Sequence, residues 1–198
     1  MSLATLLSTC FALFLGASGW SLAEYWIHRE LGHNPKKLKN PFGKEHIAHH
    51  GKGNYFAPAW KKGGAALLAT ALLIGPAVWL AGPRLGVAFV GGFVGFYLTY
   101  ELIHRLEHVF EGIGPYGRWA RTHHFWHHFH NPRMNHGVTT PVWDHVFGTY
   151  EKPGVVEVPR KMAMQWLVDE ESGEVHAHLR DRYALRGAPA KVLDSHAA

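Results

Sequence analysis

Four compact groups of histidines, each beside a long apolar stretch, limit what this chain can fold into more than any other feature. The sequence has 17 histidines, and ten of them form these groups: His28 and His33; His46, His49 and His50; His104 and His108; His124, His127 and His128. Neutral imidazole is the commonest nitrogen ligand for transition metals. Cys10 is the single cysteine, so one chain holds neither a disulfide nor a multi-thiolate site. The groups therefore predict a metal site of nitrogen ligands at a membrane surface.

Three apolar stretches are long enough to cross a bilayer as helices, which takes about 20 residues. They cover about residues 3–27, 64–81 and 85–103, and only Gly82-Pro83-Arg84 separates the last two. This short connection predicts a helical hairpin. We interpret the first stretch as a span rather than a cleaved signal peptide, because no basic segment precedes it and it leads directly into His28.

Helix-breaking and small residues predict the shape and packing of the hairpin. The pair Gly75-Pro76 predicts a kink, because proline removes an internal hydrogen bond. Gly91, Gly92 and Gly95 offer a face of small residues along which another helix packs closely.

This order of spans places all four histidine groups on one side of the membrane. The first helix ends at His28, the chain stays on that side through His50, and the hairpin leaves and returns at His104. The opposite side has only Arg84, whereas the histidine side carries Arg29, Lys36, Lys37, Lys39, Lys44, Lys52, Lys61, Lys62, Arg105, Arg118 and Arg121. The excess of basic residues predicts that the histidines face the cytoplasm, from a bacterial inner membrane or the endoplasmic reticulum.

The expected fold class is all-α. We expect residues 1–154 to form an integral membrane helical bundle with about three transmembrane helices and a cytosolic, histidine-rich helical cap that holds two metal ions. Residues 155–198 are polar and are expected to form a cytosolic C-terminal tail without a second domain. Within this tail, residues 175–185 fit a short amphipathic helix, residues 161–168 a short helix or strand, and residues 188–198 a disordered end.

The spacing within the groups favours helical ligand sets. His46, His49 and His50 are at i, i+3 and i+4, and His124, His127 and His128 repeat the pattern, so each set is expected to point its rings at one spot. His28 and His33 are five residues apart, or about 140° around an ideal helix. They share a face only if the helix ends near Gly32 or contains a π-bulge, and both alternatives stay open here.

Ten ligands are too many for one ion. Two ions with about five nitrogens each would leave an open position on each for O2 or substrate, and all-nitrogen ligation suits iron, copper, nickel or zinc. His123 is expected to lie behind the ligands or to replace His124 through a shift of register. His130 and His136 are candidates for additional ligands or for residues on the substrate side.

Metal-bound histidines usually donate their second N–H to a carboxylate or a carbonyl. The candidate carboxylates are Glu24, Glu30, Glu45, Glu101, Glu107 and Asp144, and Glu101 and Asp144 are the first choices for a supporting catalytic role because each lies close to a histidine group. Arg29, Lys52 and Arg133 are candidates for binding an anionic substrate head group. A basic, solvated face explains these three cations equally well.

At these residues the sequence resembles the fatty acid hydroxylase and sterol desaturase superfamily of membrane di-iron enzymes. The matching segments are residues 24–33, 46–50, 100–108, 124–128 and 143–149, so the resemblance covers about residues 20–150. Within this superfamily the sequence most resembles fatty acid 2-hydroxylases. Three features carry the resemblance: the histidine spacing in the first segment, the third segment, and His-His-Phe-Trp-His-His-Phe at 123–129 followed by residues 137–144.

The resemblance implies O2-dependent hydroxylation of an aliphatic C–H bond in a lipid, most simply at carbon 2 of a fatty acid or fatty acyl chain. It also implies two iron ions as cofactors, with zinc as a possible occupant after purification. The sequence shows neither a glycine-rich dinucleotide loop nor a Cys-x-x-Cys-His haem motif. We therefore expect a separate electron donor, such as a ferredoxin with its reductase, that a basic cytosolic surface would attract.

Two alternatives remain open at this point. The first is another reaction of the superfamily, either hydroxylation of a sterol or carotenoid or desaturation. The second is a non-enzymatic membrane protein that binds or transports metal. Transporters place their ligands near the bilayer midplane, whereas these histidines lie beyond the ends of the spans, which disfavours transport. A nucleic acid partner is not expected, because apolar segments dominate a chain that is only modestly basic.

Overall fold

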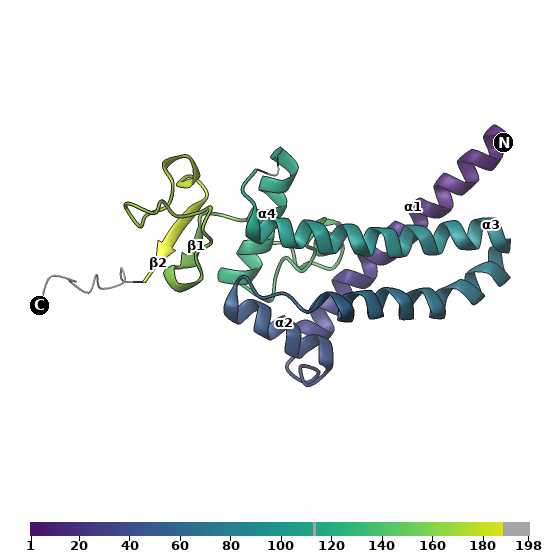
Figure 1. Ribbon diagram of the computed structural model, residues 1–198, viewed down its shortest axis with the longest axis horizontal. Helices are drawn as coiled ribbons and strands as arrows, with labels where there is room; N and C mark the ends of the chain where they lie inside the picture. Colours follow the sequence, from purple (N-terminus) through teal and green to yellow (C-terminus); the bar gives the residue numbers. More distant parts are fainter. Residues whose placement is uncertain (113, 188–198) are drawn as a thin grey trace, which may run out of the picture.

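Two long apolar helices form one end of the molecule in the computed structural model, which describes residues 1–112 and 114–187 (Figure 1). Helix α1 spans Leu3–Trp26 and helix α3 spans Ala59–Val109. Both have the length and apolar composition of membrane spans. Large apolar side chains such as Leu67 and Trp79 point outward, and Trp79 is 83% exposed. A lipid environment would cover this apolar surface, which is larger than soluble proteins usually expose.

Helix α3 turns back on itself at Gly82 and forms the expected hairpin (Figure 1). Gly82 has φ 77° and ψ 165°, a conformation open to glycine because it has no Cβ. The two arms run antiparallel: the Tyr97 hydroxyl donates to the Lys62 carbonyl at 3.1 Å, and Lys62 pairs with Glu101. Pro76 lies inside the helix and keeps helical backbone angles, and the break in the helix occurs at Gly82, where the turn of the hairpin was expected.

Helices α1 and α3 approach each other at two glycines. A Cβ atom on Gly16 would lie 1.9 Å from the Phe89 carbonyl oxygen, and one on Gly92 would lie 2.0 Å from the Leu13 carbonyl oxygen. Only a glycine fits such backbone contact, as in other close helix pairs of membrane proteins. Of the predicted glycine face, Gly92 makes this contact, whereas a Cβ on Gly95 would meet no atom within 4 Å.

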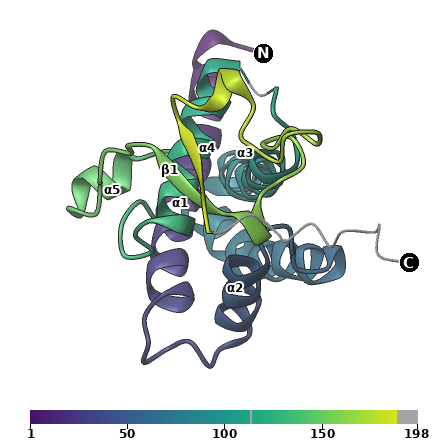
Figure 2. The same cartoon turned by 90° about the vertical axis from the view of Figure 1, so that its left-hand side faces the viewer.

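Shorter helices extend the bundle at the end opposite the hairpin turn. A π-helix, Ile27–Gly32, continues α1, and α2 spans Pro41–Lys52. Asn40 caps the N-terminus of α2, because its side chain accepts from the Gly43 amide at 2.9 Å. The first residue of the helix is Pro41, as is common at this position. Helix α4, Gly114–Phe129, follows α3, and α5 covers Val142–Val146. Figure 2, viewed from this end, shows α2 below α3 and α4.

The segment after residue 155 packs on α4 and departs from the all-α expectation. Strands β1, Val156–Pro159, and β2, Tyr183–Arg186, pair in parallel, with 3-10 turns at Arg160–Met162 and Ala177–Leu179 between them. The predicted helix over 175–185 is therefore wrong. Its apolar residues instead join a core with the aromatic side of α4, a cluster that includes Val156, Val158, Leu167, Leu179, Tyr183, Phe125, Trp126 and Phe129.

The structure is mostly helical, and its two longest helices coincide with the apolar stretches of the sequence. The spans expected at about 3–27, 64–81 and 85–103 correspond to α1 and to the two arms of α3. Among the described residues, two helices rather than three have the length and composition of a span, because α3 is continuous except at Gly82. The disorder expected for 188–198 lies outside the described residues.

Candidate metal centre

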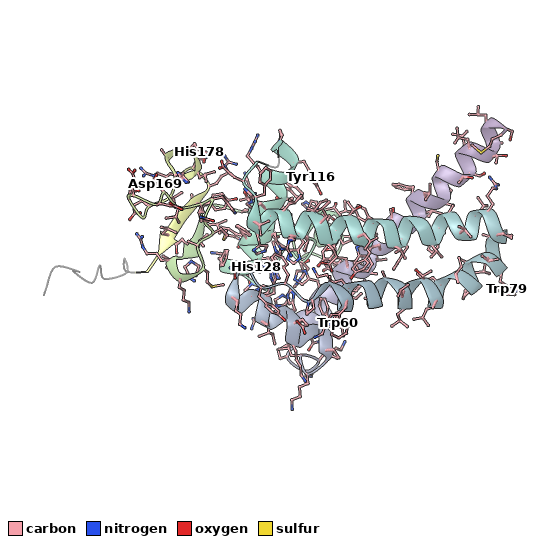
Figure 3. All side chains as sticks on the ribbon, in the orientation of Figure 1. Trp60, Trp79, Tyr116, His128, Asp169 and His178 are labelled. Carbon is pink, nitrogen blue, oxygen red and sulfur yellow. The ribbon has the colours of Figure 1, made fainter. Side chains whose placement is uncertain are left out.

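Side chains from the π-helix, α2, α3 and α4 bring all ten grouped histidines together in two sets of five. In each set one ring nitrogen from every member lies within 4.8 Å of the others. Site one consists of His28, His33, His46, His50 and His127, and site two of His49, His104, His108, His124 and His128. Figure 3 shows His128 among the gathered nitrogen-bearing side chains, between α2 and the long helices.

The ring nitrogens of site one converge at distances typical of ligands around one ion. The His46 Nε2 atom lies 3.1 Å from His28 Nε2 and 2.7 Å from His33 Nε2, and His127 Nε2 lies 2.8 Å from His33 Nε2. Two nitrogens each about 2.1 Å from an ion and at right angles would be separated by about 3 Å. The spacing therefore fits a shared ion.

Site two has the same geometry and lies directly beside site one. The Nε2 atoms of His49 and His104 are 2.9 Å apart, and those of His108 and His124 are 3.0 Å apart. His50 of site one stacks on His128 of site two, with ring centroids 3.9 Å apart. The two sites thus share a wall of imidazole rings.

The histidine triplets on α2 and α4 divide between the two sites instead of each facing one spot. His46 and His50 of α2 belong to site one, but His49 belongs to site two. On α4 the division is reversed, since only His127 reaches site one. Adjacent residues of a helix point in directions that differ by about 100°. His49 and His50 on α2, and His127 and His128 on α4, can therefore face two ions that lie side by side.

The π-helix explains how His28 and His33 reach the same site. A π-helix bonds residue i to residue i+5, so residues five apart come to the same side. The structure combines the two alternatives that the sequence left open, because the helix becomes a π-helix and also ends at Gly32, directly before His33. Gly32 also packs here: a Cβ on it would lie 2.8 Å from the His46 ring.

Backbone carbonyls, rather than carboxylates, hold the second nitrogen of three of these rings. The Nδ1–H groups of His28, His49 and His127 donate to the carbonyls of His136, Tyr55 and Met134 at 2.5, 2.6 and 2.7 Å. A carbonyl only accepts, so the proton must sit on Nδ1. This fixes the tautomer and leaves the Nε2 lone pair facing the site, as metal-bound histidines require.

Burial keeps the imidazoles of both sites neutral. It lowers the pKa of His33 to about 4, with His136 adding a smaller effect, and lowers the pKa of His49 to about 4. Desolvation also lowers the pKa of His46, His124 and His127 well below the ordinary value, because it disfavours the charged ring. A neutral imidazole is the form that binds a metal.

The donor set fits a pair of transition metal ions. Each site offers five imidazoles and no thiolate, a set that suits iron, copper, nickel or zinc rather than calcium or magnesium. The Nε2 atoms of His50 and His128 are buried and have no hydrogen-bond partner among the described residues. Buried polar atoms are rarely left unpaired, so these nitrogens indicate a ligand that the protein itself does not provide.

Asp144 lies at the centre of a hydrogen-bond network beside site one. Its carboxylate is fully buried and accepts from the amides of His136 at 2.8 Å and Gly137 at 2.9 Å, and from the Thr149 hydroxyl at 2.8 Å. The His136 carbonyl is the acceptor for His28. Asp144 therefore holds the loop that orients a histidine of site one, without touching that histidine.

The other predicted carboxylates have different partners and positions. Glu101 pairs with Lys62, and Glu30 and Glu45 bind surface lysines. Glu24 is buried and accepts from the Val138 amide at 2.8 Å, which pins the same loop that Asp144 holds. Glu107 is fully buried, and neither of its oxygens has a hydrogen-bond partner among the described residues.

The three additional histidine candidates have different surroundings. His123 is buried 3.4 Å from Asp144, so His124 takes the place in site two. His130 is exposed and stacks on Trp126 at 3.8 Å, away from both sites. His136 is buried beside site one, with ring centroids 5.5 Å from His28 and 5.3 Å from His127, but it is not among the five convergent histidines.

The basic residues divide into surface and buried groups. Of the three head-group candidates, Arg29 donates to the Tyr25 hydroxyl at 2.9 Å, Lys52 lies over the Tyr55 ring, and Arg133 is exposed. Their role stays a prediction. Arg121, placed on the basic face by its sequence position, is instead 1% exposed.

Arg121 and Trp166 hold the end of α3, which sequence analysis missed. Arg121 donates to the carbonyls of Glu107 at 2.8 Å and Phe110, and its guanidinium lies 4.0 Å from the Trp166 ring centroid. Trp166 in turn donates from its indole N–H to the His108 carbonyl at 2.8 Å. The last carbonyls of a helix have no donor within it, so these side chains supply what the end of α3 lacks. His108 of site two belongs to this last turn.

Comparisons with known proteins show which family the chain belongs to. The model of the fatty acid hydroxylase family matches residues 13–149. The chain is 30% identical to a dihydroceramide fatty acyl 2-hydroxylase of Arabidopsis thaliana, over 74% of this chain and 62% of that protein. It is 31% identical to a ceramide very long chain fatty acid hydroxylase of Saccharomyces cerevisiae, over 74% of this chain and 40% of the relative. A fatty acid 2-hydroxylase of Homo sapiens is 31% identical, with coverages of 70% and 40%.

A solved structure of full-length scs7p, in which only the hydroxylase domain is visible, has a similar fold. The TM-score is 0.59 and the identity 27%, over 74% of this chain and 58% of the solved one. The chain thus spans 40% to 62% of the length of these curated relatives. The family match includes all ten grouped histidines and Asp144. The chain belongs to the fatty acid hydroxylase family.

Proposed function

We propose that this protein is a membrane-bound, O2-dependent di-iron monooxygenase that hydroxylates a fatty acyl chain, at carbon 2. The observation that carries the proposal is the pair of adjacent sites with five histidines each, in a chain of the fatty acid hydroxylase family. A protein that transports or stores metal does not require two adjacent metal sites that share a wall of imidazole rings. A two-electron oxidation, in contrast, benefits from two adjacent ions.

The ten grouped histidines would hold two iron ions, five to each site. Bound iron would supply the redox chemistry that reduces O2 and oxidises an aliphatic C–H bond. Zinc lies above iron in the affinity order for nitrogen sites, so zinc is expected to occupy the sites in protein purified without added iron. Reconstitution tests this assignment: the iron form should turn over and the zinc form should not, and the opposite result would refute the redox mechanism.

The protein's own contribution is to orient the ligands and to keep water out. Carbonyl acceptors fix the rings of His28, His49 and His127, and Asp144 holds the loop that provides one of these carbonyls. The side chains of His28, His108, His124 and His127 are buried. A dry, preorganised site holds its ligands in place without rearrangement during the reaction and protects reactive species from side reactions.

The lipid would reach the site from the membrane-spanning end. An apolar hollow of about 300 Å³ lies between the two arms of α3, lined by Ile74, Val87, Val90 and Val94 among others. We place part of the acyl chain along these arms. The second arm of α3 leads to His104 of site two. Arg29, Lys52 and Arg133 are the candidates for an anionic head group at the aqueous end.

The names of two relatives point to the form of the substrate. The Arabidopsis thaliana protein is named for a dihydroceramide fatty acyl group and the Saccharomyces cerevisiae protein for ceramide. We propose that the substrate is an acyl chain of a membrane lipid. Free fatty acid is the alternative substrate to be tested. In this arrangement α1 and the two arms of α3 cross the membrane, and the histidine sites face the cytoplasm.

Turnover requires two electrons from outside this chain. Oxidation of one C–H bond by O2 gives one alcohol and one water and consumes two electrons and two protons. We propose that a soluble one-electron carrier, such as a ferredoxin reduced by its reductase, supplies the electrons.

The proposal is tested with iron-loaded protein in lipid nanodiscs. Protein, O2, a ferredoxin, its reductase and NADPH are mixed with acyl lipids, and the products are analysed by mass spectrometry. We expect 2-hydroxylated acyl chains that are absent with the His104→Ala variant. A double bond instead of a hydroxyl group would indicate a desaturase, and stoichiometric metal binding without any O2 uptake would favour a non-enzymatic role.

A further inference from the structure

We propose that a basic hollow between α4 and the C-terminal segment is the docking surface for an acidic one-electron carrier protein; the carrier's role rests on the function proposed above. The hollow encloses about 270 Å³ and is lined by three cations, Arg118, Lys152 and Arg182, around an aromatic floor of Trp119 and Tyr150. It lies outside both histidine sites.

The positive charge of the hollow is available to a partner. Arg118 and Lys152 are exposed, and neither forms an ion pair with another described residue. Arg182 pairs with the exposed Asp181 at 3.3 Å and contributes less. Some other basic side chains are less available to a partner: Lys37, Lys61 and Lys62 each bind a glutamate, and Arg121 is buried. A concentration of one sign of charge in a concave surface attracts a partner of the opposite sign and speeds its association.

A buried histidine of α4 stacks on both aromatic residues of the floor. The His123 ring is fully buried, and its centroid lies 5.4 Å from that of Trp119 and 5.9 Å from that of Tyr150. The next residue along α4, His124, belongs to site two. A carrier seated in the hollow would therefore contact the helix that carries three of the ten grouped histidines.

The position of the hollow favours a soluble protein over a lipid head group. Its residues belong to α4 and to the segment that continues into β1 and β2, at the end of the molecule opposite the hairpin turn (Figure 1). Trp79, near that turn, marks the apolar end in Figure 3. Each reduced carrier would deliver one electron and leave oxidised, so two successive dockings supply the two electrons that one C–H oxidation consumes.

The test measures carrier binding rather than product. Full-length iron-loaded protein in nanodiscs of uncharged lipid is titrated with a plant-type [2Fe–2S] ferredoxin at low ionic strength. The double variant Arg118→Glu/Lys152→Glu is compared with Lys36→Glu/Lys39→Glu, which makes the same change in net charge at two exposed lysines of another surface. We expect the hollow variant to bind about tenfold more weakly or worse, and the control within about twofold of wild type.

Three further measurements make the result decisive. The single variant Lys152→Glu should show a smaller loss of the same sign, and added salt should weaken wild-type binding far more than that of the double variant. Equal losses in the hollow and control variants, or a loss in neither, would overturn the docking site. A hollow variant that keeps ferredoxin binding but loses binding to anionic vesicles would reassign the surface to lipid.

A chemical reductant separates this inference from the proposed function. With a small uncharged electron mediator in place of ferredoxin, the double variant should form as much product as wild type. If ferredoxin binds in the hollow but no lipid is hydroxylated under any condition, the proposed function fails and the docking surface stands. If lipid is hydroxylated and the hollow variant binds and uses ferredoxin normally, the docking surface fails and the function stands.

Discussion

Replacement of Asp144 by asparagine should weaken metal binding at site one and leave site two nearly unchanged. The buried carboxylate accepts from the amides of His136 and Gly137 and from the Thr149 hydroxyl, at 2.8 to 2.9 Å. An asparagine of the same shape keeps one oxygen, so its NH2 group must face a donor. In the best orientation the asparagine oxygen keeps the hydrogen bonds from the His136 amide and the Thr149 hydroxyl. The Gly137 N–H is then left unpaired in the interior.

The magnitude follows from these contacts. A hydrogen bond to a charged acceptor contributes about 1.5–3 kcal/mol, and a buried unpaired N–H adds a further penalty, so the expected destabilisation is about 2–4 kcal/mol. The loop also carries the His136 and Met134 carbonyls that orient His28 and His127. Loss of such support typically lowers metal affinity by about 10- to 100-fold. No contact of this loop orients a ring of site two among the hydrogen bonds of the described residues.

The assay combines metal titration, resolved into its two sites with spectroscopically active Co²⁺, and thermal unfolding. Asp169→Asn is the matched control, because Asp169 is a half-buried aspartate of the C-terminal segment, away from both sites, that also accepts from a backbone amide, that of Ser172. The reasoning is refuted if Asp144→Asn retains both ions at wild-type affinity, or if it loses both ions equally.

The same carboxylate predicts a pH effect. Burial raises the pKa of Asp144, but hydrogen bonds from His123, Gly137, Thr149 and His136 outweigh burial and hold it below its ordinary value. A folded-state pKa below the unfolded value means that this carboxylate stabilises the fold above the ordinary aspartate pKa. The contribution is lost as the pH falls through the lowered value. Wild type should therefore lose its advantage over Asp144→Asn in acid, as measured by the difference in thermal midpoints across pH.

Three further predictions concern other parts of the molecule. Gly92→Val should destabilise the fold by about 1–3 kcal/mol or prevent folding, because its side chain would clash with the Leu13 carbonyl, whereas Gly95→Val, where the space is open, should fold normally in thermal unfolding; equal effects would argue against the α1–α3 contact. Trp166→Phe keeps an aromatic ring but loses the N–H that donates to the His108 carbonyl. It should therefore weaken metal binding at site two alone in the same Co²⁺ titration, and weaker binding at site one would contradict the assignment. Single replacements by alanine should lower the metal content from two ions per chain, at site two for His49→Ala and His108→Ala and at site one for His127→Ala, as measured by metal analysis of folded protein; full retention in all three would refute the ligand sets.

Spacing along the sequence was enough to predict which histidines gather, because helical periodicity acts over short distances. It could not predict how the triplets divide. Whether His49 faces the same ion as His46 and His50 depends on where α3 lies relative to α2, and the sequence does not encode that placement locally. The five-residue gap between His28 and His33 narrowed the local structure to two alternatives, and the three-dimensional structure contains both, a π-helix that ends at Gly32.

The groups that support the ligands were the least visible in the sequence. The acceptors for His28, His49 and His127 are backbone carbonyls, which every residue has, so no residue type marks them. From the sequence, Arg121 resembles the other surface cations. In the structure it is buried and donates to carbonyl groups at the end of α3. The C-terminal segment was misread because β1 and β2 are short and pair across 23 intervening residues, between Pro159 and Tyr183.

The central claim is that this chain uses O2 to hydroxylate an acyl chain at a metal centre formed by its ten grouped histidines. The most direct measurement is mass spectrometry of acyl lipids after turnover of iron-loaded protein under O2 labelled with heavy oxygen. The account predicts 2-hydroxylated chains in which the new hydroxyl group carries the label, and no such product from His104→Ala or His127→Ala protein. A hydroxyl group whose oxygen comes from water, or unchanged lipid with a fully loaded and reduced metal centre, would contradict it.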